Sequence, residues 1–384
     1  MIKRLKFFIE VYMKLPTFTF RNQQIPFPII QGGMGIGFSN YILAGTVSKY
    51  GGLGIISSAA LDSVVSFRLK EKYNTRGACA KEVSDAKKIS EGRPVGINIM
   101  VATVNDYENS VLGSMDGGVD IIISGAGLPT KLPAIVETHP RSLEVALVPI
   151  VSSARALTII IKKWEKYHRL PDAVVVEGPL AGGHIGWTKK EDAYAESNKL
   201  ENLVNEVLEL TRQYDIPLIA AGGIHNHCDI KKYLNMGCAA VQMGTRFLAT
   251  FESGASQEYK EHLVKCTKGD IDLADIPGSP CKLLFRVIKT SPFYQQALNK
   301  SRPPLCNKGY ILVNGVCAAQ NNTDSFCICN GLLASAGVEG NELGLYTVGG
   351  RADEINQIIS VKDLMQELIT NPDVLLSNQM VSHM

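Results

Sequence analysis

Eight short runs of β-branched and apolar residues recur along the chain, and a stretch with helical periodicity follows each of them. The candidate strands are Pro28–Gln31, Leu53–Ser57, Val95–Ile99, Val119–Ser124, Val145–Pro149, Ala173–Glu177, Pro217–Ala221 and Ala240–Met243. Helices are expected near residues 39–50, 63–90, 105–117, 129–138, 153–168, 198–214, 226–236 and 253–265. Eight βα units in about 250 residues are typical of one α/β fold, the (β/α)8 TIM barrel.

The pattern changes at both ends of this region and predicts three parts. Residues 1–20 form a basic N-terminal leader, whose apolar run is interrupted too early for a signal peptide. Residues 21–280 form the barrel, and residues 281–384, rich in turn-forming residues, form an accessory segment packed on it with a helix at 361–370. The charged insertion at 187–202 can act as a lid, although a solvated face is the commoner role of such a run.

Charge and hydropathy exclude two classes of partner. The 384 residues carry a formal net charge of +2 without a long basic block, which argues against nucleic acid. No apolar run reaches the length of about 18 residues that a membrane span needs. We therefore expect a cytoplasmic protein that acts on a small molecule and has neither a membrane nor a nucleic-acid partner. The accessory segment can cover the barrel mouth or form a subunit contact in a homodimer.

The nine cysteines fall into two groups. Cys79, Cys228, Cys238, Cys266 and Cys281 are scattered, as in a reducing compartment, and are expected to be ordinary thiols. The other four cluster near the C-terminus without the paired C-x-x-C spacing of zinc sites, so free thiols are the default there and one disulfide is the alternative. These four are Cys306, Cys317, Cys327 and Cys329.

Glycine-rich loops follow the last two expected strands. Ala221-Gly222-Gly223-Ile224 follows the seventh strand, and Gln242-Met243-Gly244-Thr245 ends the eighth. In a TIM barrel these two loops commonly bind phosphate through their backbone N–H groups. A cofactor with a phosphate group is therefore expected, and FMN suits the site because its ring can cross the barrel mouth.

A histidine flanked by glycines follows the sixth expected strand, in Ala181-Gly182-Gly183-His184-Ile185-Gly186. Glycines allow the backbone to lie against a ligand, and a strand end of a TIM barrel faces the active site. A histidine that only satisfies hydrogen bonds of a turn is the structural alternative. His225 and His227 form a close pair of histidines further along the sequence, but their i, i+2 spacing does not suit a metal hydrolase.

Six segments together resemble the nitronate monooxygenase family, formerly called the 2-nitropropane dioxygenases, which includes the similar enoyl-ACP reductase II enzymes. The segments are Pro28–Gly35, Gly51–Gly54, Gly96–Met100, Glu177–His184, Ala220–Ile224 and Gln242–Phe247, in the order of the family. The resemblance implies an FMN-dependent (β/α)8 oxidoreductase with Gly33, Met34 and Asn98 near the isoalloxazine. It implies that Gly222, Gly223, Gln242, Gly244 and Thr245 surround the ribityl phosphate, and that Glu177, Gly182 and Gly183 complete the cofactor-binding set.

The resemblance makes His184 the catalytic residue but leaves two reactions open. The first is a nitronate monooxygenase that oxidises alkyl nitronates with O2 to carbonyl compounds, in which His184 takes the acidic proton or holds the anion. The alternative is an NAD(P)H-dependent FMN enoyl-thioester reductase, in which the histidine lies near the thioester. Ile185 favours the reductase, whereas Trp187 with its insertion and the C-terminal extension depart from a minimal reductase. A barrel that binds a phosphate ligand without turnover is a third, weaker hypothesis.

Overall fold

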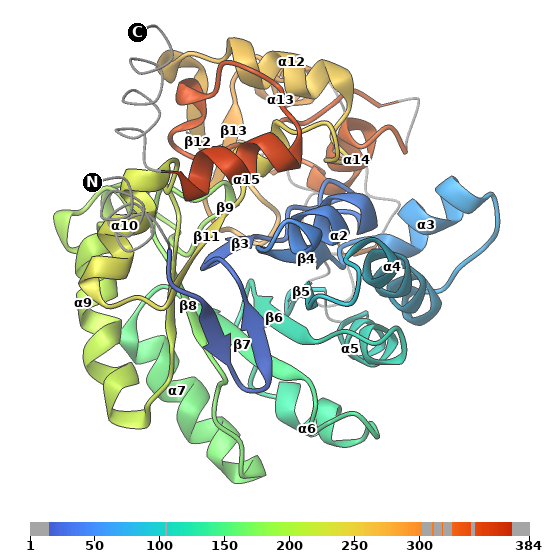
Figure 1. The fold of residues 1–384 in the computed structure, drawn as a ribbon. Helices are drawn as coiled ribbons and strands as arrows, with labels where there is room; N and C mark the ends of the chain where they lie inside the picture. Colours follow the sequence, from blue (N-terminus) through green and yellow to red (C-terminus); the bar gives the residue numbers. More distant parts are fainter. Residues whose placement is uncertain are drawn as a thin grey trace, which may run out of the picture.

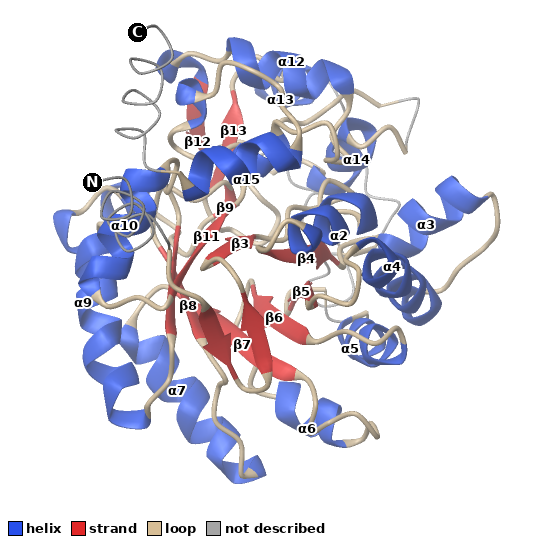
Figure 2. Ribbon diagram, viewed as in Figure 1, coloured by secondary structure: helices blue, strands red, loops and turns tan. Residues whose placement is uncertain are grey.

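The computed structural model describes residues 15–103, 106–301, 309–310, 317, 325–338 and 342–370. Its centre is a closed barrel of eight parallel strands, each paired with the next in the chain (Figures 1 and 2). In chain order the strands are β3 (Ile29–Gln31), β4 (Leu53–Ser57), β5 (Val95–Met100), β6 (Ile121–Gly125), β7 (Ala146–Val151), β8 (Val174–Glu177), β10 (Leu218–Ala221) and β11 (Ala240–Met243). Because β11 pairs with β3, the barrel closes. The expected TIM-barrel fold and all eight expected strands are confirmed.

Side chains that point into the barrel form one apolar cluster, and a short hairpin covers its N-terminal end. The hairpin consists of β1 (Phe18–Phe20) and β2 (Gln23–Ile25), whose apolar side chains join that cluster. Between its strands, Arg21 forms an ion pair of 2.9 Å with Asp172, just before β8. The opposite, C-terminal end of the barrel is thus the one left for ligands.

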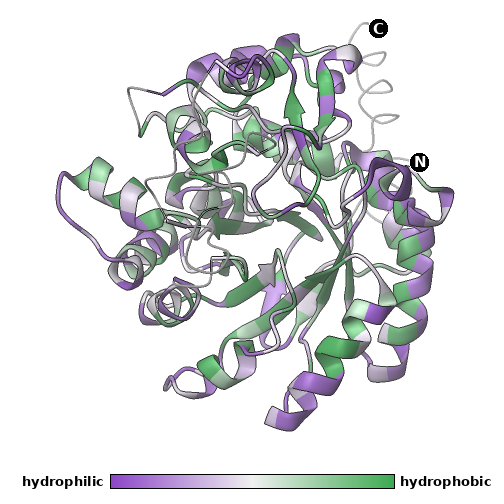
Figure 3. Cartoon of the chain, turned by 180° about the vertical axis from the view of Figure 1, so that it is seen from behind, coloured by the Kyte–Doolittle hydropathy of each residue, from purple (hydrophilic) through white to green (hydrophobic). Residues whose placement is uncertain are grey.

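A layer of helices surrounds the barrel, with apolar residues toward the strands and polar residues outward (Figure 3). These helices are α2 (Tyr41–Lys49), α3 (Leu61–Leu69), α4 (Thr75–Ile89), α5 (Tyr107–Asp116), α6 (Leu132–Glu137), α7 (Ala154–Trp164), α9 (Leu200–Thr211) and α10 (His227–Met236). Three further helices, α8 (Lys190–Ala193), α11 (Thr245–Leu248) and α12 (Gln257–Lys265), lie toward the C-terminal end of the barrel. Short 3-10 turns cover Glu165–Tyr167, Glu196–Asn198, Arg212–Tyr214, Lys268–Asp270 and Ala352–Glu354.

Two of the expected helices differ in the structure. The stretch 63–90 contains two helices, because Lys70 has a left-handed backbone that ends α3, and the Asn74 side chain caps the start of α4. The helix expected from 253 begins at Gln257, where Ser256 accepts a hydrogen bond from the backbone of Tyr259. In both places a capping side chain sets the start of the helix.

A second, small sheet lies beyond the C-terminal ends of the barrel strands (Figure 1). It joins β12 (Ile271–Ala274), β13 (Phe285–Ile288) and β9 (Gly183–His184) in antiparallel pairs. The helices α13 (Pro292–Leu298) and α14 (Ile328–Ser335) complete this part. The helix α15 (Val361–Ile369), which matches the helix expected at 361–370, instead packs against α2 and α10 in the layer around the barrel (Figure 1). Strands on both sides of residue 280 thus share a sheet, and the division at that residue stays a prediction.

Among the described residues, no helix is both long and apolar enough to cross a bilayer. The thiols of Cys79, Cys228, Cys238, Cys266 and Cys281 are free. Cys306 lies outside the described residues, so the expectation for the four C-terminal cysteines stays a prediction. Within the described part of the chain, no group of three or more His, Cys, Asp or Glu side chains is arranged to hold a metal ion.

Candidate active site

A cavity of about 880 Å³ opens at the C-terminal ends of the barrel strands. Every residue expected at the site from the sequence lines it, and the roles of these residues stay predictions. They are Gly33, Met34, Asn98, Glu177, Gly182, Gly183, His184, Gly222, Gly223, Gln242, Gly244 and Thr245. The volume is near the upper end of the range for ligand pockets, which leaves room for a substrate beside a cofactor.

The loop after β3 forms one wall of the cavity and is held rigidly. Ser39 accepts a hydrogen bond of 2.8 Å from the backbone N–H of Met34, and Gln31 donates to the same hydroxyl at 2.8 Å. A Cβ atom on Gly33 would lie 2.4 Å from Cβ of Asn98, so this position requires glycine. The backbone at Gly33 therefore lies close to the side chain of Asn98. A flat ligand can then contact the backbone and the amide together.

Two polar side chains of the cavity, Gln242 and Glu177, offer hydrogen-bonding groups to a ligand. The Oε1 atom of Gln242 is buried without a hydrogen-bond partner in the described structure. Burial in the barrel raises the pKa of Glu177 to about 7, so this carboxyl can be a hydrogen-bond donor at neutral pH. A buried acceptor without a partner is costly, and an N–H group on a bound heterocycle would satisfy it.

The loops after β10 and β11 form the other end of the cavity. Gly222 and Gly223 have positive φ values of 99° and 84°, and a Cβ atom on Gly222 would lie 2.8 Å from the carbonyl oxygen of Gly178. Thr245 Oγ1 accepts a hydrogen bond of 2.9 Å from the backbone N–H of Gly349. The hydroxyl proton of Thr245 thus stays available to an anion.

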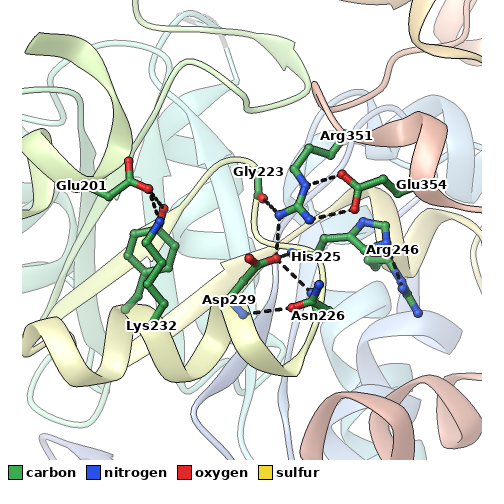
Figure 4. Close-up of polar contacts among 10 residues, drawn as sticks. Glu201, Gly223, His225, Asn226, Asp229, Lys232, Arg246, Arg351 and Glu354 are labelled. Atoms are coloured by element: carbon green, nitrogen blue, oxygen red, sulfur yellow. Dashed lines mark hydrogen bonds and ion pairs between the residues drawn. The ribbon is translucent and has the colours of Figure 1, made fainter. Parts of the chain in front are cut away.

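An arginine from the accessory segment braces this end (Figure 4). Arg351 donates to the carbonyl oxygen of Gly223 at 2.9 Å and to Asp229 Oδ2 at 2.6 Å, and it also pairs with Glu354. Asp229 in turn accepts from the backbone N–H of His225, at the start of α10. The accessory segment therefore fixes the carbonyl group of Gly223, in the loop between β10 and α10.

Arg246 also lines the cavity and contacts a neutral histidine (Figure 4). Its Nη1 lies 3.1 Å from Nε2 of His225, and its Nη2 forms an ion pair of 2.8 Å with Glu367. Burial, and next to it the charge of Arg246, lower the pKa of His225, so the imidazole stays neutral and accepts the hydrogen bond. The expectation that His225 and His227 do not form a metal site stays a prediction.

His184 is held in the cavity by the small second sheet. Its backbone pairs with that of Phe285 in β13, and the two rings meet edge to face at 4.8 Å. On β13, the buried Arg286 donates to the carbonyl oxygens of Ala181 and Pro179 and so fixes the loop that leads to His184. His184 Nε2 lies 2.6 Å from the hydroxyl oxygen of Ser279.

The expectation that Cys281 is an ordinary thiol is wrong. Its Sγ lies 3.0 Å from the Ser279 hydroxyl, it forms a hydrogen bond with His184, and it lines the cavity. Burial opposes the thiolate, but the hydrogen bond and charge of His184, with help from Ser279, outweigh it and lower the pKa of Cys281 to about 7. A thiol that is half ionised at neutral pH therefore stands beside the histidine.

Sequence reasoning missed the residues that the accessory segment brings to the cavity, above all Cys281, Gly349 and Arg351. The sequence Gly349-Gly350-Arg351 repeats the glycine-pair pattern of the barrel loops and was the available signal. The 187–202 insertion contributes Trp187 and Asn198 to the cavity wall, and its role as a lid stays a prediction.

The donor set fits a flavin mononucleotide. The glycine loops with Thr245 suit a phosphate, Gln242 offers an acceptor without a partner, and the wall at Gly33 and Asn98 accepts a flat ring closely. His184 faces the same cavity from the other side and is placed to handle a proton of a molecule bound there.

Comparison with known proteins agrees with this geometry. The nitronate monooxygenase family matches residues 17–371 of the chain. A protein of Staphylococcus saprophyticus named probable nitronate monooxygenase is 26% identical over 336 residues, covering 77% of this chain and 89% of that protein. FabK of Thermotoga maritima is 26% identical with a TM-score of 0.67, covering 94% of this chain and 96% of that one. A nitroalkane oxidase of Streptomyces ansochromogenes, 20% identical with a TM-score of 0.63 over 90% and 95% of the chains, shares the fold.

Proposed function

The chain belongs to the nitronate monooxygenase family, and on this premise we propose that it is an FMN-dependent oxidoreductase that oxidises alkyl nitronates with O2 to carbonyl compounds. The observation that carries the proposal is the position of His184, which faces the cavity that the glycine loops and Gln242 also line. When bound, FMN supplies the redox chemistry, accepting electrons from the substrate and passing them to O2.

The residues of the chain have separate roles in this proposal. Gly222, Gly223 and Thr245 would bind the phosphate of FMN, while Asn98 would hold its ring system. Gln242, which the resemblance placed at the phosphate, would instead accept from an N–H group of the ring through its Oε1 atom, because that atom has no partner within the described structure. His184 takes the acidic proton next to the nitro group, or holds the anionic nitronate once that proton has left. Because the Ser279 hydroxyl can donate to or accept from Nε2, the imidazole can carry its proton on either nitrogen.

Part of the cavity remains for the substrate. Its wall on the side of His184 includes Trp187, Phe285 and residues of α14, which are mainly apolar. Such a wall displaces water and binds the alkyl part of a nitronate, while the charged end lies toward His184. We also propose the cytoplasm as the location, because the five scattered thiols are free. The homodimer stays a prediction.

The second candidate function is the NAD(P)H-dependent FMN reductase of enoyl thioesters, and the likeness to FabK favours it. In that case His184 lies near the thioester and orients or protonates the reduced substrate. The two functions differ in the electron donor: the nitronate is itself the donor in the first, whereas a nicotinamide is required in the second.

The test is a parallel assay on FMN-loaded protein. Oxygen uptake is measured with alkyl nitronates and without nicotinamide, and flavin bleaching by NADH and NADPH is measured anaerobically, followed by reoxidation with an enoyl thioester. Oxygen uptake is the expected result. No uptake, together with rapid bleaching and reoxidation, would replace the first function by the second.

His184→Ala tests the role of the histidine in the same assay. We expect a decrease in turnover of about 10² to 10⁴-fold, the usual contribution of a general base, with FMN still bound. The visible spectrum of bound FMN controls for the cofactor. Undiminished turnover in the FMN-loaded variant would show that His184 does not act on the substrate.

A further inference from the structure

Three side chains form a connected cluster at one wall of the cavity. Ser279 is 3% exposed and lies behind the wall, with its hydroxyl oxygen 2.6 Å from His184 Nε2 and 3.0 Å from Cys281 Sγ. The same hydroxyl accepts a hydrogen bond of 3.3 Å from the backbone N–H of Cys281. His184 and Cys281, by contrast, both line the cavity itself. The cluster therefore presents a sulfur and an imidazole to the same bound molecule.

The surroundings of Cys281 stabilise its ionised form. The groups that act on the thiol are His184 from β9, the Ser279 hydroxyl, and the backbone N–H of Leu283. His184 carries positive charge toward the sulfur when protonated, the Leu283 N–H donates to it, and the Ser279 hydroxyl can donate to its ionised form. Together these groups outweigh the burial of Cys281. A histidine beside a cysteine is the arrangement by which proteins activate thiols as nucleophiles.

The other scattered cysteines lack such a neighbour. Burial raises the pKa of Cys79 and Cys238 to about 12 and that of Cys266 to about 11. Cys228 is exposed on α10 and serves as an ordinary thiol for comparison. Among these five cysteines, Cys281 thus combines access to a large cavity with an activating partner.

We propose that Cys281 is a nucleophilic site, activated by His184, that takes small α,β-unsaturated carbonyl compounds from the cavity by covalent conjugate addition. This activity goes beyond the oxidation of nitronates and needs no flavin chemistry. The largely apolar cavity admits such compounds, because enals and enones are small and uncharged.

The addition is balanced without an oxidant or a leaving group. The sulfur electron pair of Cys281 forms a bond to the β-carbon, and the π-bond between the α- and β-carbons breaks. Its electron pair moves toward the carbonyl oxygen, and the protonated imidazole of His184 gives its proton to the α-carbon. The product is a saturated thioether on Cys281, with His184 left neutral.

The experiment uses the FMN-loaded protein and 2-cyclohexenone as the probe, with peptide mass spectrometry to measure the adduct on each cysteine over a range of pH. A fall in pKa of about two units raises the thiolate fraction at pH 7 about fifty-fold but lowers its intrinsic reactivity about eight-fold. We therefore expect Cys281 to react about five-fold faster at pH 7 than a cysteine in an unstructured peptide, whose thiol has the ordinary pKa. The rate at Cys281 should reach half of its plateau near pH 7.

Two variants separate activation from simple access. His184→Gln should move the pH midpoint of Cys281 up by about one unit or more, while Cys228 in the same protein reacts as before. The visible spectrum of bound FMN reports whether the fold of the variant is intact. Ser279→Ala gives a second, milder shift in the same direction. A wild-type midpoint above pH 8, or a midpoint that His184→Gln does not move, would overturn the proposal.

Discussion

Glu177 ends β8 and faces the cavity, where burial raises its pKa to about 7. Its pKa in the unfolded chain is near 4.5, so the folded flavin-free protein holds this proton more tightly than the unfolded chain does. The contribution of this proton to the free energy of unfolding is therefore fully present below about pH 4.5 and is lost as the pH rises through 7. We expect a loss of about 2 kcal/mol, allowing for water in the cavity.

Glu177→Gln should remove this loss. The flavin-free variant is expected to melt about 3 °C above the wild type at pH 8 and at nearly the same temperature at pH 5, as measured by circular dichroism. Glu209→Gln is the matched control, because Glu209 is exposed on α9. An equal difference at both pH values would contradict the assignment of the titration to Glu177.

Single residues of the site could be predicted to different degrees. His184 was recognisable because glycines flank it directly after a strand, and strand ends of a TIM barrel meet at one mouth. Ser279 and Cys281 were not recognisable, because both lie in an irregular segment far beyond the histidine. Ser279 follows His184 by 95 residues. Nothing in local periodicity indicates that such a segment returns to the cavity.

At the scale of elements, the backbone of Gly222, between β10 and α10, is tightly packed at the end of the cavity where we propose that the phosphate of FMN binds, here called the phosphate end. Gly222→Ala would place a Cβ atom 2.8 Å from the carbonyl oxygen of Gly178 at a φ of 99°. The loop must then move, so we expect FMN to bind at least about ten-fold more weakly, or about 1.4 kcal/mol. Quenching of FMN fluorescence on titration with flavin-free protein measures the effect.

Gly92→Ala is the matched control for this variant. Gly92 also has a positive φ, 82°, but a Cβ atom there meets nothing within 4 Å. Its strain should cost about 1 kcal/mol of stability and leave the affinity for FMN unchanged. If both variants weakened FMN binding alike, general destabilisation rather than the shape of the loop would be the cause.

The elements themselves followed from periodicity, apart from their ends. Eight strands were predictable because β-branched runs alternate with helical stretches. The division of residues 63–90 into α3 and α4 was missed, although Asn74 before Thr75 is a typical helix cap. Periodicity continues across such a break, so only the capping residue reveals it.

At the scale of the whole molecule, the accessory segment was the least predictable part. Periodicity shows that a strand exists but not which strand it pairs with, and β13 pairs with the two-residue β9 at His184. The segment thus supplies both the partner strand of the histidine and Arg351 at the phosphate end. The three-part division of the chain stays a prediction, but the site draws on both sides of residue 280.

The variant Arg351→Met tests whether the accessory segment shapes the phosphate end. Its guanidinium fixes the carbonyl of Gly223, while Asp229 and Glu354 balance its charge. Loss of a hydrogen bond from a charged donor costs about 1.5 to 3 kcal/mol. Arg351→Met should therefore raise the dissociation constant of FMN about ten-fold or more. Riboflavin, which has the same ring but no phosphate, should bind the variant and the wild type within about two-fold of each other.

Arg76→Met is the matched control, because it removes a comparable arginine, paired with Asp116, from α4 in the outer helix layer. Its affinities for FMN and riboflavin should equal those of the wild type. The phosphate of FMN distinguishes the two explanations for a loss at Arg351: a local role weakens FMN alone, whereas a disturbed barrel mouth weakens both ligands. Equal weakening of FMN and riboflavin by Arg351→Met would place the effect of the accessory segment in the packing of the barrel rather than in the phosphate site.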